Sequence, residues 1–312
     1  MKKILFLILF LSICTCGWTE ENAVQSSVKA KFLFDIKGDA AKGITFNQPA
    51  GIDVDKRGDI FIADTVNSRV VVVDKDGTVS FTFGKLGQGE GELSAPMALS
   101  VDSSKGLVYV ADSANYRVEV FKTDGSFVKT IDLNQDNSKK SPRPIGIAVN
   151  KEGNIYIADA DNNLIRVFSP SGEFLFKFGG FGAGDGELCV PVGLAVDAQN
   201  KIYAVDMNNS RVQVFDPEGK FLFKIGGPGD ARGNFGRPKD VAVDGQGNIF
   251  VSDGAHLVVQ IFDRDGKFLN VIGAEKEESL QFAAPFGLEI NNNYLYVTDR
   301  WRNCIRVFEI SY

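Results

Sequence analysis

The 312-residue sequence predicts an all-β fold built from six similar units. Six prolines recur at intervals of 47 or 48 residues, at positions 49, 96, 144, 191, 238 and 285. Each interval holds four short runs rich in Val, Ile, Phe and Tyr, spaced about ten residues apart, and these are the lengths and residue types of β-strands. Beyond the first residues, no window has the periodicity of an amphipathic helix. Six four-stranded units arranged in a ring form a six-bladed β-propeller.

Tight turns separate the predicted strands. Asp-Gly or Glu-Gly pairs stand at 76–77, 124–125, 152–153, 218–219 and 265–266. Glycine accepts the positive φ that tight hairpin turns require, so each pair indicates a chain reversal. The strands of each unit should therefore form an antiparallel sheet.

The two ends of the chain should complete one blade together. The sixth unit has three predicted strands and ends after Ile310. The segment 31–38 resembles the fourth-strand segments 173–179 and 220–226, which share its Phe-Leu-Phe core. We therefore expect the N-terminal strand to join the last blade and close the ring. Residues 31–312 are then a single domain.

Two motifs recur in phase with the prolines. The first is Pro-x-Gly followed by apolar residues and Val-Asp, as in the segment 49–55. The second is Ala-Asp-x-x-Asn-x-Arg-Val, as in 63–70. Together they resemble the NHL-repeat family of six-bladed propellers, over essentially the whole chain after residue 30. The resemblance implies a platform for binding and interaction rather than one particular activity.

An aspartate ends the second predicted strand of every unit, at positions 64, 112, 159, 206, 253 and 299. In units one, two and four an Asn and an Arg follow it at fixed spacing, whereas unit three has Leu164 in place of the Arg. A carboxylate at a turn accepts backbone N–H groups and pairs with a nearby guanidinium. Six copies of one carboxylate predict a structural brace, since a catalytic group need occur only once.

Residues 1–17 have the pattern of an export signal, followed by a linker over 18–30. Lys2 and Lys3 precede the apolar run from Ile4 to Ile13, which is too short to span a bilayer. Cleavage near Gly17 and lipid attachment at Cys14 both fit this segment. We expect an exported protein of the periplasm or cell envelope, with Cys14 as the candidate lipid anchor.

The charge balance limits the partners. Removal of Lys2 and Lys3 changes the net charge from −6 to −8. An acidic domain lacks the phosphate contacts that supply most nucleic-acid affinity, so nucleic acid is excluded. The single histidine, His256, excludes zinc sites built from two or three histidines. We expect a monomer without a cofactor or bound metal, which contacts a membrane only through a lipid anchor and binds a protein, peptide or glycan.

Cations and one aromatic residue gather on turns that depart from the repeat pattern. In a propeller, the inter-blade connections and the turns between second and third strands share one face, which is the usual ligand site. On this face we place the candidate ligand-binding residues Arg143, Arg237, Lys239, His256, Arg300, Trp301 and Arg302. Such a set favours an anionic or aromatic-bearing partner, such as a peptide carboxylate or an acidic glycan. Arg and Trp are also over-represented among the residues that dominate interfaces.

The sequence shows no compact catalytic constellation. We therefore expect a non-catalytic binding scaffold, with no catalytic residue assigned. The alternative is a propeller enzyme, a lactonase-like hydrolase or a lyase that uses a metal bound in the channel. Asp240 favours this alternative, because it replaces the glycine of the Pro-x-Gly motif at the start of an inner strand.

Overall fold

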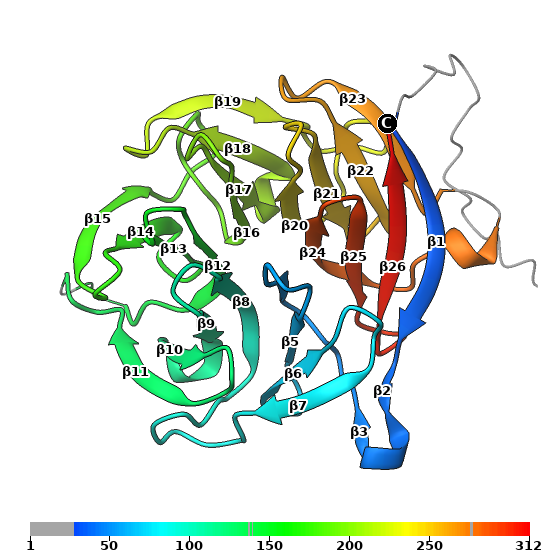
Figure 1. Ribbon diagram of the computed structural model, residues 1–312. Coiled ribbons are helices and arrows are strands. Elements are labelled where there is room, and N and C mark those ends of the chain that lie inside the picture. The colour runs from blue at the N-terminus through cyan, green and yellow to red at the C-terminus, as the bar shows by residue number, and fades with distance from the viewer. Residues whose placement is uncertain (1–27, 137, 139, 275–276) are drawn as a thin grey trace, which may run out of the picture.

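The protein is a ring of six four-stranded antiparallel sheets around a central channel (Figure 1). The computed structural model describes residues 28–136, 138, 140–274 and 277–312. The expected signal segment, including Cys14 and Gly17, and most of the expected linker lie outside the described residues. The predicted all-β propeller with four-stranded blades is confirmed.

Each of the first five blades contains four strands that run outward from the channel in chain order. Blade 1 contains β4 (Ile52–Val54), β5 (Ile60–Asp64), β6 (Arg69–Val73) and β7 (Val79–Phe83). Blade 2 contains β8 (Pro96–Asp102), β9 (Leu107–Asp112), β10 (Arg117–Lys122) and β11 (Phe127–Asp132). Blade 3 contains β12 (Pro144–Val149), β13 (Ile155–Asp159), β14 (Leu164–Phe168) and β15 (Phe174–Gly179). Blade 4 contains β16 (Pro191–Val196), β17 (Ile202–Asp206), β18 (Arg211–Phe215) and β19 (Phe221–Ile225). Blade 5 is formed by β20 (Pro238–Val243), β21 (Ile249–Asp253), β22 (Val258–Phe262), β23 (Phe268–Ile272).

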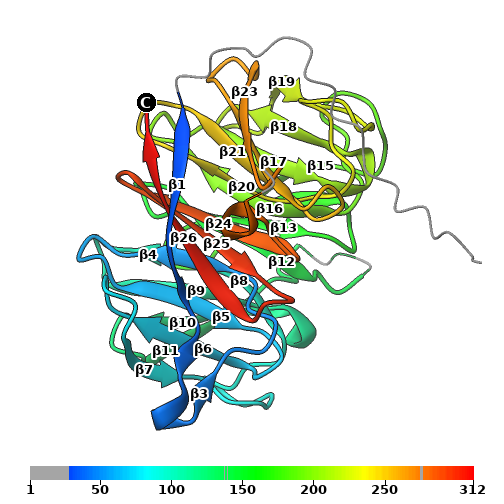
Figure 2. The ribbon, with the colours of Figure 1, turned by 90° about the vertical axis from the view of Figure 1, so that its right-hand side faces the viewer.

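Blade 6 is shared by the two ends of the chain. It contains β24 (Pro285–Asn291), β25 (Tyr294–Asp299) and β26 (Cys304–Ser311), with β1 (Lys29–Ile36) as its outer strand. In Figures 1 and 2, β1 lies along the whole length of β26. The predicted ring closure is confirmed. The strand begins at Lys29, two residues earlier than expected, so the end of the expected linker belongs to the sheet.

Helical structure is minor. The described residues hold short 3-10 turns, and none has the length and apolarity that crossing a bilayer requires. Their bounds are η1 (Ala40–Lys42), η2 (Ser113–Asn115), η3 (Met207–Asn209) and η4 (Glu278–Leu280). Between β1 and blade 1, η1 joins the small hairpin of β2 (Gly38–Asp39) and β3 (Ile44–Thr45), which the repeat pattern did not predict.

The core lies between neighbouring blades. Phe178 at the end of β15 packs on Phe215 of blade 4, with ring centroids 4.9 Å apart. Along β15, Phe174 and Phe176 are partly buried, whereas Leu175 between them faces outward and is 48% exposed. The alternation confirms that the Phe-rich fourth strands pack blade against blade, as expected for strands with one buried face.

The glycines of the Pro-x-Gly motif let inner strands approach one another beside the channel. A Cβ on Gly146 would lie 1.9 Å from the carbonyl oxygen of Val192 in the next blade. A Cβ on Gly287 would lie 2.1 Å from the carbonyl oxygen of Ala50. No side chain fits at these distances, so glycine at these two positions allows the neighbouring inner strands to lie close together.

The aspartate at the end of each second strand is a buried brace, as predicted. In blade 1, Oδ1 of Asp64 accepts the backbone N–H of Asn47 at 2.7 Å, from the preceding inter-blade connection. Its Oδ2 accepts Asn67 Nδ2 at 2.8 Å and Arg69 Nε at 2.9 Å. One carboxylate thus holds together an inter-blade connection, a turn and a third strand.

The brace in blade 3 has its arginine at another position. Leu164 stands where the other units have Arg, but Arg166 donates Nε to Asp159 Oδ2 at 2.7 Å. Its Nη1 also contacts Asp136 at 2.7 Å. Both brace partners are fully buried. The apparent loss of the arginine in this unit is therefore a shift by two residues.

Removal of the N-terminal strand should destabilise the ring. A variant lacking the chain up to Gly38 exposes the β26 edge and leaves the apolar side chains of blade 6 uncovered. We expect its melting temperature to fall by about 5 °C or more relative to a variant that starts at Val28, with visible aggregation. Equal melting temperatures and solubility would contradict the closure.

The brace can be tested in blade 4. Asp206→Ala leaves Arg211, nearly buried, without its carboxylate, so we expect the free energy of unfolding in urea to fall by about 3 to 5 kcal/mol. The control is Asp124→Ala, which removes an exposed turn carboxylate that accepts Ser126 N–H and should therefore cost much less. Similar losses in both variants would count against the brace.

Candidate functional site

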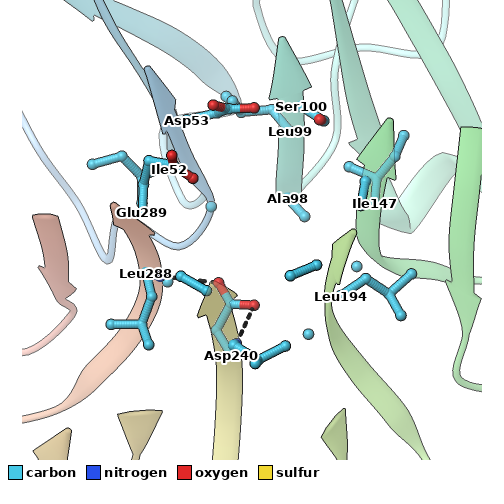
Figure 3. Close-up of a pocket in the computed structure, with 18 of the residues that line it drawn as sticks. Ile52, Asp53, Ala98, Leu99, Ser100, Ile147, Leu194, Asp240, Leu288 and Glu289 are labelled. Atoms are coloured by element: carbon cyan, nitrogen blue, oxygen red, sulfur yellow. Dashed lines mark hydrogen bonds between the residues drawn. The ribbon is translucent and has the colours of Figure 1, made fainter. Parts of the chain in front are cut away.

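The inner strands of the blades enclose a cavity of about 190 Å³ in the central channel (Figure 3). Apolar residues such as Ile52, Leu99, Ile147 and Leu194 line it, but polar atoms make up the larger part of its accessible surface. The cavity is small compared with ordinary ligand pockets, so it holds a small molecule or one end of a longer chain.

Two aspartates in this wall join neighbouring blades. Asp53 Oδ2 accepts the backbone N–H of Val101 in blade 2 at 2.7 Å. Asp240 Oδ2 accepts the backbone N–H of Leu288 in blade 6 at 2.9 Å. Each also accepts, through Oδ1, the N–H of the residue that follows it. The sequence analysis took Asp240 to favour a metal site. In the structure its carboxylate joins blade 5 to blade 6.

Burial raises the pKa of all three carboxyl groups in the channel. The pKa of Asp53 rises to about 6 and that of Asp240 to about 7, and backbone N–H groups oppose both shifts. The pKa of Glu289 lies well above its ordinary value, because it is buried and faces the charges of Asp53 and Asp240. Within the described residues, no group of three or more His, Cys, Asp or Glu side chains is arranged to hold a metal ion.

We call the face formed by the inter-blade connections and the turns between second and third strands the loop face. Two of the predicted ligand-binding residues there lie beside acidic side chains. Arg143 lies in blade 3, where its Nη2 is 2.8 Å from Asp161 Oδ1. His256 is nearly buried in blade 5, with Nδ1 2.9 Å from Asp253 Oδ2 and Nε2 3.2 Å from Asp230. His256 thus stands beside the brace aspartate in place of the Asn-Arg pair, although its buried Nδ1 forms no hydrogen bond to any described residue.

Arg302 and Trp301 lie on the turn between β25 and β26. Arg302 Nε is 3.5 Å from Asp299 Oδ2, so this arginine belongs to the blade 6 brace. Trp301 is 76% exposed and points away from the core.

Two of the predicted residues, Lys239 and Arg300, lie beside Phe286 at the channel mouth, and the exposed Arg237 is near enough for its charge to act on Lys239. We call these three cations the cationic rim. Lys239 Nζ lies 5.9 Å from the centroid of the Phe286 ring, and the Arg300 guanidinium lies 4.8 Å from it. Lys239 and Phe286 also line the channel cavity. The rim therefore stands directly at its entrance.

The two cations beside Phe286 have neutral partners. Lys239 Nζ is 3.5 Å from the thioether sulfur of Met207. Arg300 Nη2 donates to Gln48 Oε1 at 2.9 Å, while its buried Nε has no hydrogen-bond partner. Within the described part of the chain, neither side chain forms an ion pair. Each is half-buried, so both have lost hydration without gaining a carboxylate.

The pKa values of Lys239 and Arg300 reflect this arrangement. Burial lowers the pKa of Lys239 to about 8, and the charges of Arg237 and Arg300 lower it further while Asp253 opposes them. Burial also lowers the pKa of Arg300. Cations in such surroundings gain most from an anionic group, since it restores the favourable interaction that burial removed.

Phe286, Met207 and Gln48 were missed by the sequence analysis. The residue after each repeat proline is Ala50, Met97, Ile145, Val192, Lys239 or Phe286. At this position a cation, Lys239, occurs only in blade 5, and an aromatic ring, Phe286, occurs only in the adjacent blade 6. Comparison of this one column of the repeat would have identified Phe286. Met207 and Gln48 have no such signal, because they come from other parts of the unit.

Two family models match the chain. One, described as a 6-bladed beta-propeller, matches residues 42–145, and the NHL repeat matches residues 142–168 and 188–215. The chain contains NHL repeats and folds as a six-bladed propeller. A curated relative, protein brain tumor of Drosophila melanogaster, is 36% identical over 61 residues, which are 20% of this chain and 6% of that protein.

Solved structures share the propeller fold. A gluconolactonase from Xanthomonas campestris has a TM-score of 0.66 and 17% identity, over 85% of this chain and 86% of that chain. Virginiamycin B lyase from Staphylococcus aureus has a TM-score of 0.62 and 15% identity, over 91% and 99%. A protein of unknown function from Bacteroides thetaiotaomicron has a TM-score of 0.67 and 16% identity, over 92% and 76%. At these identities the likeness concerns the fold alone.

The cationic rim predicts a pH-dependent affinity for anions. Since the pKa of Lys239 is lowered to about 8, its charge is present below that pH and is lost above it. Ionisation of Asp53 and Asp240 between about pH 6 and 7 adds negative charge to the channel below. The affinity for a hexaglutamate peptide, measured by calorimetry, should therefore fall as pH rises from 6.5 to 9.5.

Lys239→Arg is the matched variant for this titration. An arginine keeps its charge throughout that range, so the decline above pH 8 should largely disappear. An affinity that is constant with pH in the unmodified protein, or that declines equally in the variant, would contradict the assignment.

Proposed function

We propose that this protein is an exported, non-catalytic binding scaffold that takes an anionic group of a peptide or glycan at the cationic rim. One observation carries the proposal: Lys239 and Arg300 flank Phe286 at the channel mouth without an acidic partner among the described residues. The other cations predicted for this face, Arg143, His256 and Arg302, are occupied by aspartates.

An anionic ligand compensates the charge of the two half-buried cations, Lys239 and Arg300. A half-buried cation without a counter-charge is an unfavourable element of a fold, and proteins usually pair it. An anionic ligand pairs with both cations at once, and Phe286 gives its neighbouring atoms an apolar surface. Charge-assisted hydrogen bonds to Arg and Lys are among the stronger polar contacts. The rest of the ligand lies over the loop face or enters the small cavity.

The double variant Lys239→Ala/Arg300→Ala tests the site. We expect its affinity for hexaglutamate or for an oligogalacturonate, measured by calorimetry at low salt, to fall about tenfold or more. Whichever probe binds the unmodified protein identifies the peptide or glycan class. Arg143→Ala is the control, since it removes a cation of the same face that already pairs with Asp161. Equal affinities in the double variant and the unmodified protein would overturn the proposal.

An enzyme with a channel-bound metal is the second candidate. It is favoured by the carboxyl groups of Asp53, Asp240 and Glu289 in one cavity beneath the rim. A gluconolactonase and a virginiamycin B lyase share the fold, which adds weight to this candidate. Because the aspartate oxygens accept backbone N–H groups of neighbouring blades, we place it second.

Metal analysis distinguishes the two candidates. After dialysis against a calcium buffer and removal of free ions, we expect less than one equivalent of calcium, zinc or magnesium per chain. One equivalent that disappears in Glu289→Gln would establish a metal site in the channel and favour the enzyme.

The proposal includes the export inferred from the first seventeen residues. Lys2, Lys3 and the apolar run support it, as they are the parts of a signal peptide. The intact mass of the protein recovered from its native cell distinguishes cleavage near Gly17 from a diacylated Cys14. A mass that retains Met1 would contradict export by this route.

A further inference from the structure

A second pocket lies at the seam where the ring closes. It has a volume of about 510 Å³, within the ordinary range of small-molecule sites. Three parts of the molecule form its wall: the closing strand β1, two turns of blade 1, and the β24–β25 turn of blade 6. Figure 2 shows β1 running along β26 beside blade 1. The cationic rim contributes none of its lining residues.

The pocket coincides with the shortest turn between first and second strands. In blade 1 the last paired residues of these strands are Val54 and Ile60, six positions apart, and blades 3, 4 and 5 have the same spacing. In blade 6 the equivalent pair is Ile290 and Leu295, five positions apart. The shorter turn, Asn291 to Tyr294, covers less of the seam than its counterparts would.

Aromatic side chains form the apolar part of the wall. Phe34 of β1 is 38% exposed and Tyr294 of β25 is 43% exposed. Tyr296 lines the same pocket and is buried, and Leu33 and Val307 complete the apolar surface. Half-exposed rings at the wall of a pocket offer faces for stacking against a flat molecule.

Two lysines supply the charge. Within the described residues, Lys56 has no acidic partner for its ammonium group, and Lys75 has Asp76 at 4.0 Å. Arg57 is also part of the wall, but its guanidinium is already paired with Asp55 at 2.9 Å and Asp59 at 2.7 Å. Asp76 also lines the pocket, so Lys56 is the unpaired cation of the wall among the described residues, and Lys75 is available to a ligand only in competition with the exposed Asp76.

We propose that this seam pocket binds a small molecule with a flat apolar body and one anionic group. The body lies between Phe34 and Tyr294, and the anion faces Lys56 and Lys75. This site is independent of the cationic rim and of the function proposed for it. Occupancy also couples to ring closure, because the ligand contacts β1 and blade 1 together and therefore stabilises the closed ring.

The probe for this site is 8-anilinonaphthalene-1-sulfonate, a flat aromatic anion whose fluorescence rises on binding. The titration is made in the Lys239→Ala/Arg300→Ala background, so that the rim does not contribute. In that background, Lys56→Glu/Lys75→Glu should weaken binding about fivefold or more. Tyr294→Ala should weaken it by a similar factor through the loss of stacking. A saturating concentration of the probe should raise the melting temperature of the rim background, and should raise it less or not at all in the pocket variants.

Lys151→Glu/Arg264→Glu is the matched control. Lys151 and Arg264 occupy the same turn positions as Lys56 and Lys75, in blades 3 and 5, and line no part of the pocket. This control should leave the affinity within about twofold. Equal losses in the control and the pocket variants, unchanged binding in the pocket variants, or binding that is abolished already in the rim background would each overturn the proposal.

Discussion

Each blade depends on a carboxylate that is fully buried at the end of its second strand. This carboxylate joins the preceding inter-blade connection to the turn that follows it, as Asp64 joins Asn47 to Asn67 and Arg69. The cost of burying the charge is offset by several N–H donors and, in most blades, by a guanidinium. Because both joined segments lie on the loop face, the brace also fixes the geometry of that face.

Blades 5 and 6 vary this arrangement and thereby form the cationic rim. In blade 5, His256 stands beside the aspartate in place of the Asn-Arg pair, and in blade 6 Arg302 binds the aspartate from within the turn. Arg300, next to the brace aspartate, is left to reach across Phe286 toward Gln48 of the first blade. Blade 6 therefore keeps its brace, while Arg300, which follows the brace aspartate, lies at the channel mouth.

Charge changes sign along the channel axis. Lys239 and Arg300 stand at the mouth, and the carboxyl groups of Asp53, Asp240 and Glu289 lie in the cavity within. Burial keeps those carboxyl groups protonated to higher pH than usual, which limits their repulsion of an anion at the mouth. In a chain with a net charge of −6, anion binding at the rim is a local effect of side-chain placement.

The repeat itself made most of the fold predictable from the sequence. The prolines, turn glycines and the likeness of 31–38 to other fourth strands sufficed for six blades and their closure. The choice among seven candidate residues was not predictable, because it depends on which carboxylates reach which cations across blades. Arg166 shows the same limit, since its role follows from reach rather than from the repeat position. The seam pocket lies beside a turn that is one residue shorter than its counterpart in blade 1, and it forms where the ends of the chain meet.

The central claim is that Lys239 is a half-buried cation awaiting an anion. Nuclear magnetic resonance of reductively ¹³C-methylated lysines, with Lys239→Arg to assign the signal, measures its pKa directly. The account predicts a pKa well below that of the exposed lysines, which rises when hexaglutamate or oligogalacturonate binds and when Arg300 is replaced by Ala. A pKa equal to that of the exposed lysines, unchanged by either, would contradict it.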